Sequence, residues 1–279
     1  MSSTGESETP AELTLIIGGP GSGKSTYLVQ LFGRLQEGSS AFSLVDAPES
    51  LGPVRDGLNR LAQGLPVRHT STGAELIQEL KTVRNDGAEV RVSIPDYPGE
   101  AVDELVARRR VPFRWRDLAV ESARWLLFVR VEQMPDLPGL PAREVSTPSS
   151  PDLQRELPMD IRLVELLQIL RHERRRRKPS ASEMPDLTIV MSCWDEISDK
   201  PDGIAPASIL HERAPLMHSY AEASWEPARL SVVGLSAQGL SLEESNPNAQ
   251  FIDLGPESMG FLVRQDGTVT DDLTELLAR

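Results

Sequence analysis

The chain has 279 residues, 39% of them hydrophobic, which is enough to bury a full α/β core and favours one large domain with insertions. Its formal net charge of −13 argues against a general nucleic-acid binder, because capture of a phosphate backbone needs a positive field. A single cysteine excludes an internal disulfide framework and a cysteine-based zinc site.

Residues 1–11 are predicted to form a disordered tail. This segment has neither the positively charged region nor the apolar region of a secretion signal. No later run approaches about 18 consecutive apolar residues, the length of a membrane span. We therefore expect a cytoplasmic protein without a membrane segment.

A strand, a glycine-rich loop and a helix are predicted next. Residues 13–17, LTLII, form a β-prone apolar run that leads into GGPGSGKS. The helix that follows has Gly38 as its C-terminal stop. Its apolar positions recur with helical period at Leu28, Leu31, Phe32 and Leu35.

The loop matches the phosphate-binding pattern G-x-x-x-x-G-K-[ST] over its whole length. In such a loop, backbone N–H groups and a helix N-terminus converge on phosphate oxygens. Lys24 is expected to reach the β and γ phosphates and Ser25 to bind Mg²⁺ through its hydroxyl. The residues predicted to contact phosphate are Gly18, Gly21, Ser22, Gly23, Lys24, Ser25 and Thr26.

A second helix is predicted to begin near Thr72. The sequence from Thr72 to Glu75 has the form of a capping box, and the apolar Leu76, Ile77 and Leu80 follow it.

The segment AEVRVSIPDYPGE indicates another strand, in which Val90, Val92 and Ile94 alternate. Asp96 stands just past its predicted end, where a carboxylate can hold Mg²⁺ through water opposite Ser25. Asp96 to Gly99 also has the form D-x-x-G, in which the Gly99 N–H can sense a γ-phosphate. A plain turn built from Asp, Pro and Gly is the alternative.

A Pro/Ser-rich insertion near residues 133–158 is expected to be a loop, a lid or a partner-binding segment. A helix is predicted after it, and the basic run RHERRRRK at 171–178 ends this helix, where cations suit the negative terminus. Its apolar stripe consists of Leu163, Leu166, Leu167 and Leu170.

Two further buried parallel strands are predicted within residues 187–196 and 228–239. Asp195 should lie at the mouth of the sheet, beside Ser236 and Ala237 if the two strands are neighbours. Trp194 offers an aromatic surface there, but we expect it to be a core residue.

The predicted fold is therefore an α/β P-loop NTPase with a doubly wound, mostly parallel sheet flanked by helices. Residues 12–239 should form this domain, and 240–279 a C-terminal extension packed on it, with a hairpin around 265–267 and a terminal helix. The histidines lack metal-ligand spacing, so Mg²⁺ is the one metal expected.

The ordered set GxxxxGKS, DxxG, SxxD and SA resembles the G1, G3, G4 and G5 motifs of the translation-factor-related (TRAFAC) GTPases. The stretches GLPVRHTST, DYPGE, SCWDE and MGFLVRQDGTVTDDLTELL narrow the resemblance to the bacterial double-GTPase (DO-GTPase) group of conflict and defence systems. The resemblance implies GTP, GDP and Mg²⁺ as ligands, and partner proteins in a multi-component bacterial system.

The resemblance also implies which residues recognise the base. The G4 motif is usually N/T-K-x-D, in which the Asp accepts the N1 and N2 hydrogens of guanine and the Lys lies across the base. Asp195 matches the Asp and Ser192 the first position, whereas Cys193 replaces the Lys. Since adenine presents an acceptor on the corresponding edge, guanine specificity can survive this replacement with weaker affinity.

In the resembled group a threonine between G1 and G3 closes over Mg²⁺ and the γ-phosphate. Thr70 is our first choice and Thr72 the second. Glu100 follows DxxG, where many GTPases have a water-positioning Gln, and its carboxylate would repel the γ-phosphate. Lys24, Thr70 and Glu100 are therefore the predicted catalytic residues of a slow or partner-activated GTPase. The run RRR at 108–110 is expected to be solvated.

The leading hypothesis is a GTP-binding protein that hydrolyses GTP slowly and acts as a nucleotide-dependent switch on a partner protein. One alternative is an ATP-dependent enzyme, either an ATPase or a small-molecule kinase. The other is a pseudo-GTPase scaffold that binds nucleotide for stability alone.

Overall fold

The computed structural model describes residues 12–38, 40–46, 52–68, 76–96, 105–106, 108–109, 111–130, 132, 158–178, 180, 184–197 and 203–278. The predicted N-terminal tail and residues 133–157 of the insertion lie outside this set. Within it, no helix combines the length and apolar character that a bilayer crossing requires.

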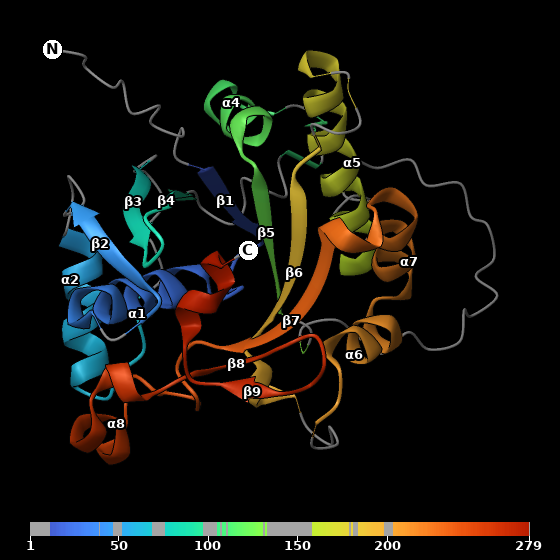
Figure 1. Cartoon of the computed structure of the whole chain (residues 1–279). Coiled ribbons are helices and arrows are strands. Elements are labelled where there is room, and N and C mark those ends of the chain that lie inside the picture. The colour runs from blue at the N-terminus through green and yellow to red at the C-terminus, as the bar shows by residue number, and fades with distance from the viewer. Residues whose placement is uncertain are drawn as a thin grey trace, which may run out of the picture.

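In the described part of the chain nine strands form one sheet in the order β2-β3-β4-β1-β5-β6-β7-β8-β9 (Figure 1). The five central strands, from β4 to β7, pair in parallel, and the outer strands pair antiparallel. The bounds are β1 Glu12–Gly18, β2 Phe42–Asp46, β3 Leu76–Arg84, β4 Glu89–Asp96, β5 Arg124–Arg130, β6 Asp186–Ser192, β7 Leu230–Ser236, β8 Phe261–Val263 and β9 Val269–Thr270.

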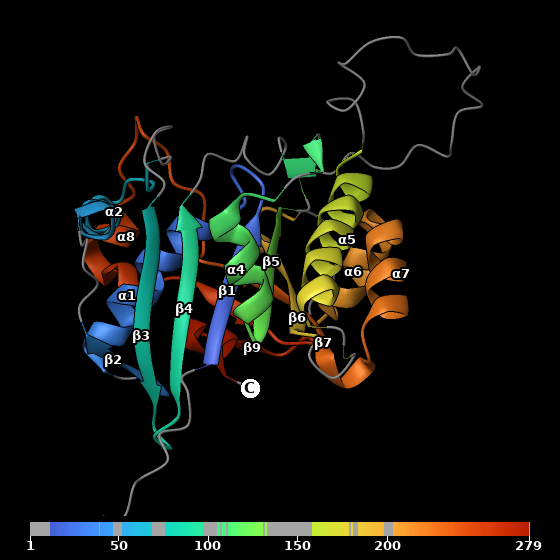
Figure 2. The same cartoon turned by 90° about the horizontal axis from the view of Figure 1, so that it is seen from above.

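Helices cover both faces of the sheet. One face packs against α4, α5, α6 and α7, and the other against α1, with α2 beside α1 and α8 beside α2 (Figure 2). The bounds are α1 Lys24–Glu37, α2 Gly52–Ala62, α4 Phe113–Glu121, α5 Met159–Arg177, α6 Pro206–Arg213, α7 Pro215–Ser224 and α8 Ala249–Leu254. The predicted doubly wound, mostly parallel α/β sheet flanked by helices is confirmed.

The two-faced burial follows from the alternation of side chains along each central strand. In β5, Trp125, Leu127 and Val129 belong to the core under α4–α7, whereas Leu126 and Phe128 belong to the core under α1. Each of these side chains is at most 3% exposed. A strand buried on both faces reads as a continuous apolar run, as RWLLFVR does.

The two strongest helix predictions are confirmed. The four apolar residues predicted to form the buried stripe of α1 are all buried, and Gly38 ends the helix with φ 69°. In α5 the four predicted leucines are likewise buried.

The basic residues at the C-terminal end of α5 also contact α4, in addition to lying at the negative terminus of their own helix. Arg174 is 4% exposed, and its guanidinium donates to the carbonyls of Ala119, Val120 and Ser122. These carbonyls lie at the C-terminal end of α4, where backbone acceptors lack helical partners. Arg177 pairs with Asp117 at 2.6 Å. Part of the basic run therefore joins α5 to α4.

The helix predicted from Leu76 to Leu80 is wrong, because this segment is strand β3. It pairs antiparallel with β4 from Leu76, opposite Asp96, to Val83, opposite Glu89. The turn after it contains Gly87 with φ 86°, a conformation that glycine adopts without a steric penalty. Over so short a segment the spacing of apolar residues fits either structure, and pairing with β4 decides between them.

The segment after β7 joins the same sheet. The hairpin predicted around residues 265–267 is confirmed, because β8 and β9 pair antiparallel on either side of it. The predicted terminal helix is a 3₁₀ helix, Leu273–Leu277. Arg34 of α1 holds this segment by donating to the carbonyls of Asp271, at 2.6 Å, and Met259.

Candidate functional site

The carboxyl ends of four parallel strands meet along one edge of the sheet. Gly18 at the end of β1 lies opposite Phe128 of β5, and Arg130 at the end of β5 lies opposite Ser192 of β6. The last pair between β6 and β7 joins Ser192 to Leu235, and β7 ends one residue later at Ser236. In parallel α/β sheets this edge is where ligands bind.

The glycine-rich loop connects β1 to the N-terminus of α1. Gly21 and Gly23 have φ 65° and 76°, so both adopt left-handed backbone that a β-carbon would strain. The first turn of α1 contains no acidic residue, so its N–H groups and its dipole favour an anion. Of the seven residues predicted to contact phosphate, Gly18 ends β1 and the other six lie in this loop or in that turn.

Lys24 folds back into the loop. Its ammonium donates to the carbonyls of Gly18 at 2.8 Å and Gly19 at 2.7 Å, and to the Ser22 hydroxyl at 3.0 Å. The Ser22 hydroxyl in turn donates to Gly19 at 2.8 Å. The loop thus holds a cation at its centre, which is the charge that a di- or triphosphate requires there.

The two residues predicted to hold Mg²⁺, Ser25 and Asp96, belong to the first turn of α1 and to the end of β4. The last β1–β4 pair joins Leu15 to Ser93, and the two strands run three residues further, to Gly18 and Asp96. Asp96 is the last residue of β4 rather than the residue after it, and its side chain lies outside what the structure describes. The described residues contain no group of three His, Cys, Asp or Glu that would hold a metal alone. A hydroxyl from Ser25, with phosphate oxygens and water, is the donor set that Mg²⁺ prefers.

The residues predicted to recognise a base form a tight turn after β6. Trp194–Glu196 is a 3₁₀ helix, and Asp195 within it accepts a short hydrogen bond from the Ser236 hydroxyl. Ser236 is fully buried and also accepts from the Gly239 N–H at 2.8 Å. Ser236 therefore orients the half-buried Asp195 carboxylate, and Ala237 follows it at the end of β7.

Cys193 lies between this turn and the phosphate loop. It has φ 53°, and its sulfur is 3.9 Å from the position that a β-carbon on Gly23 would occupy. Burial, followed by the charge of Glu196, raises the pKa of the Cys193 thiol to about 12. At neutral pH this position thus carries no charge.

Trp194 is a core residue, as predicted, with 3% of its surface exposed. Its indole packs on Gly234 in the middle of β7, so closely that a β-carbon there would lie 2.6 Å from Cδ2. Gly234→Ala is therefore expected to displace Trp194 and to lower the free energy of unfolding by about 1–3 kcal/mol. Urea denaturation measures this loss. Gly52→Ala is the control, because a β-carbon on Gly52 would meet no atom within 4 Å, and it should not lower the free energy of unfolding.

Arg130 is a site residue that the sequence analysis missed. Its guanidinium forms a bidentate ion pair with Glu196, with Nε donating at 2.8 Å and Nη2 at 2.6 Å. The remaining nitrogen, Nη1, donates to the carbonyl of Gly21 at 3.5 Å. The available signal was a charged residue at the end of an apolar strand, on the edge where Asp195 was predicted.

The other predicted site residues are not placed. Thr70, Thr72, Gly99 and Glu100 lie outside the described residues. Of the arginine run, Arg108 and Arg109 are exposed, as expected, and Arg109 pairs with Glu165 at 3.2 Å.

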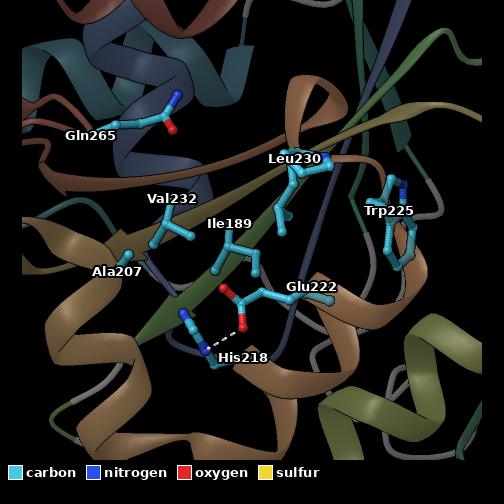
Figure 3. A pocket seen from close by; sticks show the side chains of 10 residues that line it. Ile189, Ala207, His218, Glu222, Trp225, Leu230, Val232 and Gln265 are labelled. Atoms are coloured by element: carbon cyan, nitrogen blue, oxygen red, sulfur yellow. Dashed lines mark ion pairs between the residues drawn. The ribbon is translucent and has the colours of Figure 1, made fainter.

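A separate cavity of about 250 Å³ opens between the sheet and helices α6 and α7 (Figure 3). It lies against Leu230 and Val232, in the amino-terminal half of β7, whereas Ser236 ends that strand. Its polar lining consists of His218, Glu222 and Gln265, and His218 Nδ1 is 3.4 Å from a Glu222 carboxylate oxygen. This cavity is distinct from the edge that holds the phosphate loop.

A model of the family described as Double-GTPase 1 matches residues 15–279. No curated protein matches the chain. Similar solved structures include the GTP-bound S. cerevisiae Ski7 GTPase-like domain, with 15% identity, TM-score 0.42, and coverage of 86% of this chain and 46% of that one. The Chaetomium thermophilum signal recognition particle receptor SRb-GTP/SRX complex has 14% identity, TM-score 0.40, and coverage of 84% and 94%. A bacterial selenocysteine-specific elongation factor, EF-Sec, has 11% identity, TM-score 0.40, and coverage of 82% of this chain and 26% of the factor.

Proposed function

Because this chain belongs to the double-GTPase 1 family, we propose that it binds guanine nucleotides with Mg²⁺ along the edge where β1, β5, β6 and β7 end, and that it is a slow GTPase switch. The observation that carries the proposal is the meeting of two predicted elements at that edge. The loop ending at Lys24 lies beside the turn that contains Asp195. A β-carbon added to Gly23 would be 3.7 Å from the Cβ of Ser192, which precedes that turn.

Phosphate binding is supported by the geometry of the loop. The two left-handed glycines, the N-terminus of α1 and the inward-facing Lys24 ammonium all favour negative charge at one place. Mg²⁺, held by Ser25 and through water by Asp96, would supply further positive charge to the phosphates when bound.

Guanine selectivity is supported by the orientation of Asp195. One of its carboxylate oxygens accepts from Ser236, which leaves acceptor capacity for the N1 and N2 hydrogens of guanine. Adenine has no donor at the corresponding ring nitrogen, so it would leave the second oxygen of this carboxylate without its nucleotide partner, at a cost of about 1–3 kcal/mol.

Slow hydrolysis and switching rest on residues that the structure does not describe. We assign to Thr70 and Gly99 the sensing of the γ-phosphate, and to Glu100 the orientation of water. A carboxylate beside the γ-phosphate makes hydrolysis slow until a partner protein supplies a cation. In this proposal the partner belongs to a multi-component bacterial defence system.

Calorimetric titration of the purified protein with GDP and with non-hydrolysable GTP and ATP analogues in Mg²⁺ tests the function. We expect guanine nucleotides to bind and the ATP analogue to bind about 50-fold more weakly, a factor within the range of about 5- to 150-fold that corresponds to the cost of about 1–3 kcal/mol for an unpaired buried polar group. Equal affinity for ATP would contradict the proposal and favour an ATP-dependent enzyme. Guanine-selective binding without any phosphate release from GTP would contradict the hydrolysis and favour a scaffold.

A further inference from the structure

Arg130 occupies the junction between the two halves of the site. It is the last residue of β5, and β5 lies between β1, which leads into the phosphate loop, and β6, which leads into the turn containing Asp195. A side chain at this position can reach both loops. Arg130 contacts Gly21 in the phosphate loop and Glu196 in the turn that contains Asp195.

Arg130 is a positive charge among negatively charged groups. Asp195 and Glu196 are consecutive carboxylates at the base end of the site, and the proposed ligand is a polyanion. Burial opposes the charge of Arg130, but its hydrogen bond to Glu196 and the nearby Asp195 raise the pKa of the guanidinium above its ordinary value. Arg130 therefore offsets negative charge that would otherwise repel a nucleotide.

The usual source of positive charge at this place is absent. In the resembled G4 motif a lysine precedes the base-recognising aspartate by two residues, and here Cys193 stands in that position. Its thiol is neutral, and its side chain lies against the phosphate loop near Gly23.

We propose that Arg130, on the neighbouring strand, is a positioning residue that sets guanine affinity by holding the base-recognising turn against the phosphate loop, and that it supplies the positive charge that the missing lysine would have brought. This inference rests on the proposed guanine-nucleotide site. Arg130 acts through Gly21 and Glu196, and the two loops it joins fix the distance between the phosphates and Asp195.

The ion pair is partly exposed, with 30% of the Arg130 side chain and 22% of the Glu196 side chain accessible, so solvent screens it. We therefore expect Arg130→Gln to weaken GDP binding by about tenfold rather than by several hundredfold. The ratio of GDP to ADP affinity should fall by a similar factor. Arg130→Lys keeps the charge and should retain most of the affinity. Calorimetric titration with GDP and ADP in Mg²⁺ measures both quantities.

Arg264→Gln is the matched control. Arg264 forms the same bidentate pair with Glu275, at 2.8 and 2.6 Å, away from the phosphate loop. Its removal should change GDP affinity by less than about twofold. Thermal unfolding of both variants shows whether they fold. An equal loss of GDP affinity in the two variants would overturn the role of Arg130.

Cys193→Lys provides a second test that does not depend on the stability of the Arg130→Gln variant alone. If Arg130 performs the role of the missing lysine, Cys193→Lys strengthens GDP binding more in the Arg130→Gln protein than in the wild type. Equal gains in both proteins would overturn the inference. A wild-type protein without guanine preference would instead overturn the proposed function, whereas a guanine-selective wild type with an unaffected Arg130→Gln variant overturns only the inference.

Discussion

Lys24→Ala is expected to weaken binding of GTP and GDP by at least about 100-fold, which corresponds to about 3 kcal/mol. The Lys24 ammonium is held at the centre of the phosphate loop by two backbone carbonyls and the Ser22 hydroxyl. Bound phosphate would compete for this cation, and alanine would leave the loop carbonyls facing the phosphates without it. Calorimetric titration in Mg²⁺ measures the loss.

Lys81→Ala is the control for this prediction. Lys81 is an exposed residue of β3 whose ammonium lies 4.0 Å from an Asp46 carboxylate oxygen. Its removal changes the net charge by the same amount as Lys24→Ala, so it accounts for any general electrostatic effect on nucleotide binding. If both variants lose affinity equally, the phosphate loop is not the binding site.

Asp195→Ala is expected to abolish the preference for guanine over adenine nucleotides, with a loss of GTP affinity of about 50-fold and little change for ATP. Asp195 is the carboxylate that Ser236 orients at the base end of the site. Asp195→Asn is more discriminating, because its amide can donate a hydrogen bond to a 2-oxo group. This variant should bind xanthosine nucleotides better than guanosine nucleotides, as measured by competition titration.

Asp186→Ala is the control for the base-recognition test. Asp186 begins β6, at the opposite end from Asp195, and pairs with Arg229 at 2.7 Å. Its removal should leave the ratio of GTP to ATP affinity unchanged. A guanine preference that survives in Asp195→Ala would mean that the turn after β6 does not recognise the base.

Local sequence patterns predicted the central elements well. The phosphate loop, helix α1 and strand β6 each combine a strong local signal with burial on the expected side. A glycine-rich loop between a strand and a helix has few other conformations that satisfy its backbone groups, so the pattern alone is informative. The placement of Asp195 beside Ser236 also follows from sequence, once two buried runs are taken as neighbouring parallel strands.

Elements outside the parallel central strands were predicted less well. Strand β3 was predicted to be a helix, because a capping-box pattern and apolar residues at Leu76, Ile77 and Leu80 fit a helix over a short segment. Its pairing with β4 depends on a partner strand, which no local pattern contains. The C-terminal segment was predicted to end in a helix, and docking on α1 through Arg34 accompanies its 3₁₀ conformation.

The sequence by itself determined the phosphate loop and the carboxylate at Asp195, because each depends on residues close together in the chain. Only the tertiary structure decided that Arg130 of β5 contacts both Gly21 and Glu196. Arg130 is separated from Gly21 by 109 positions along the chain and from Glu196 by 66. An ion pair between separate elements depends on strand order and register, which arise from the packing of the whole sheet and not from any one segment.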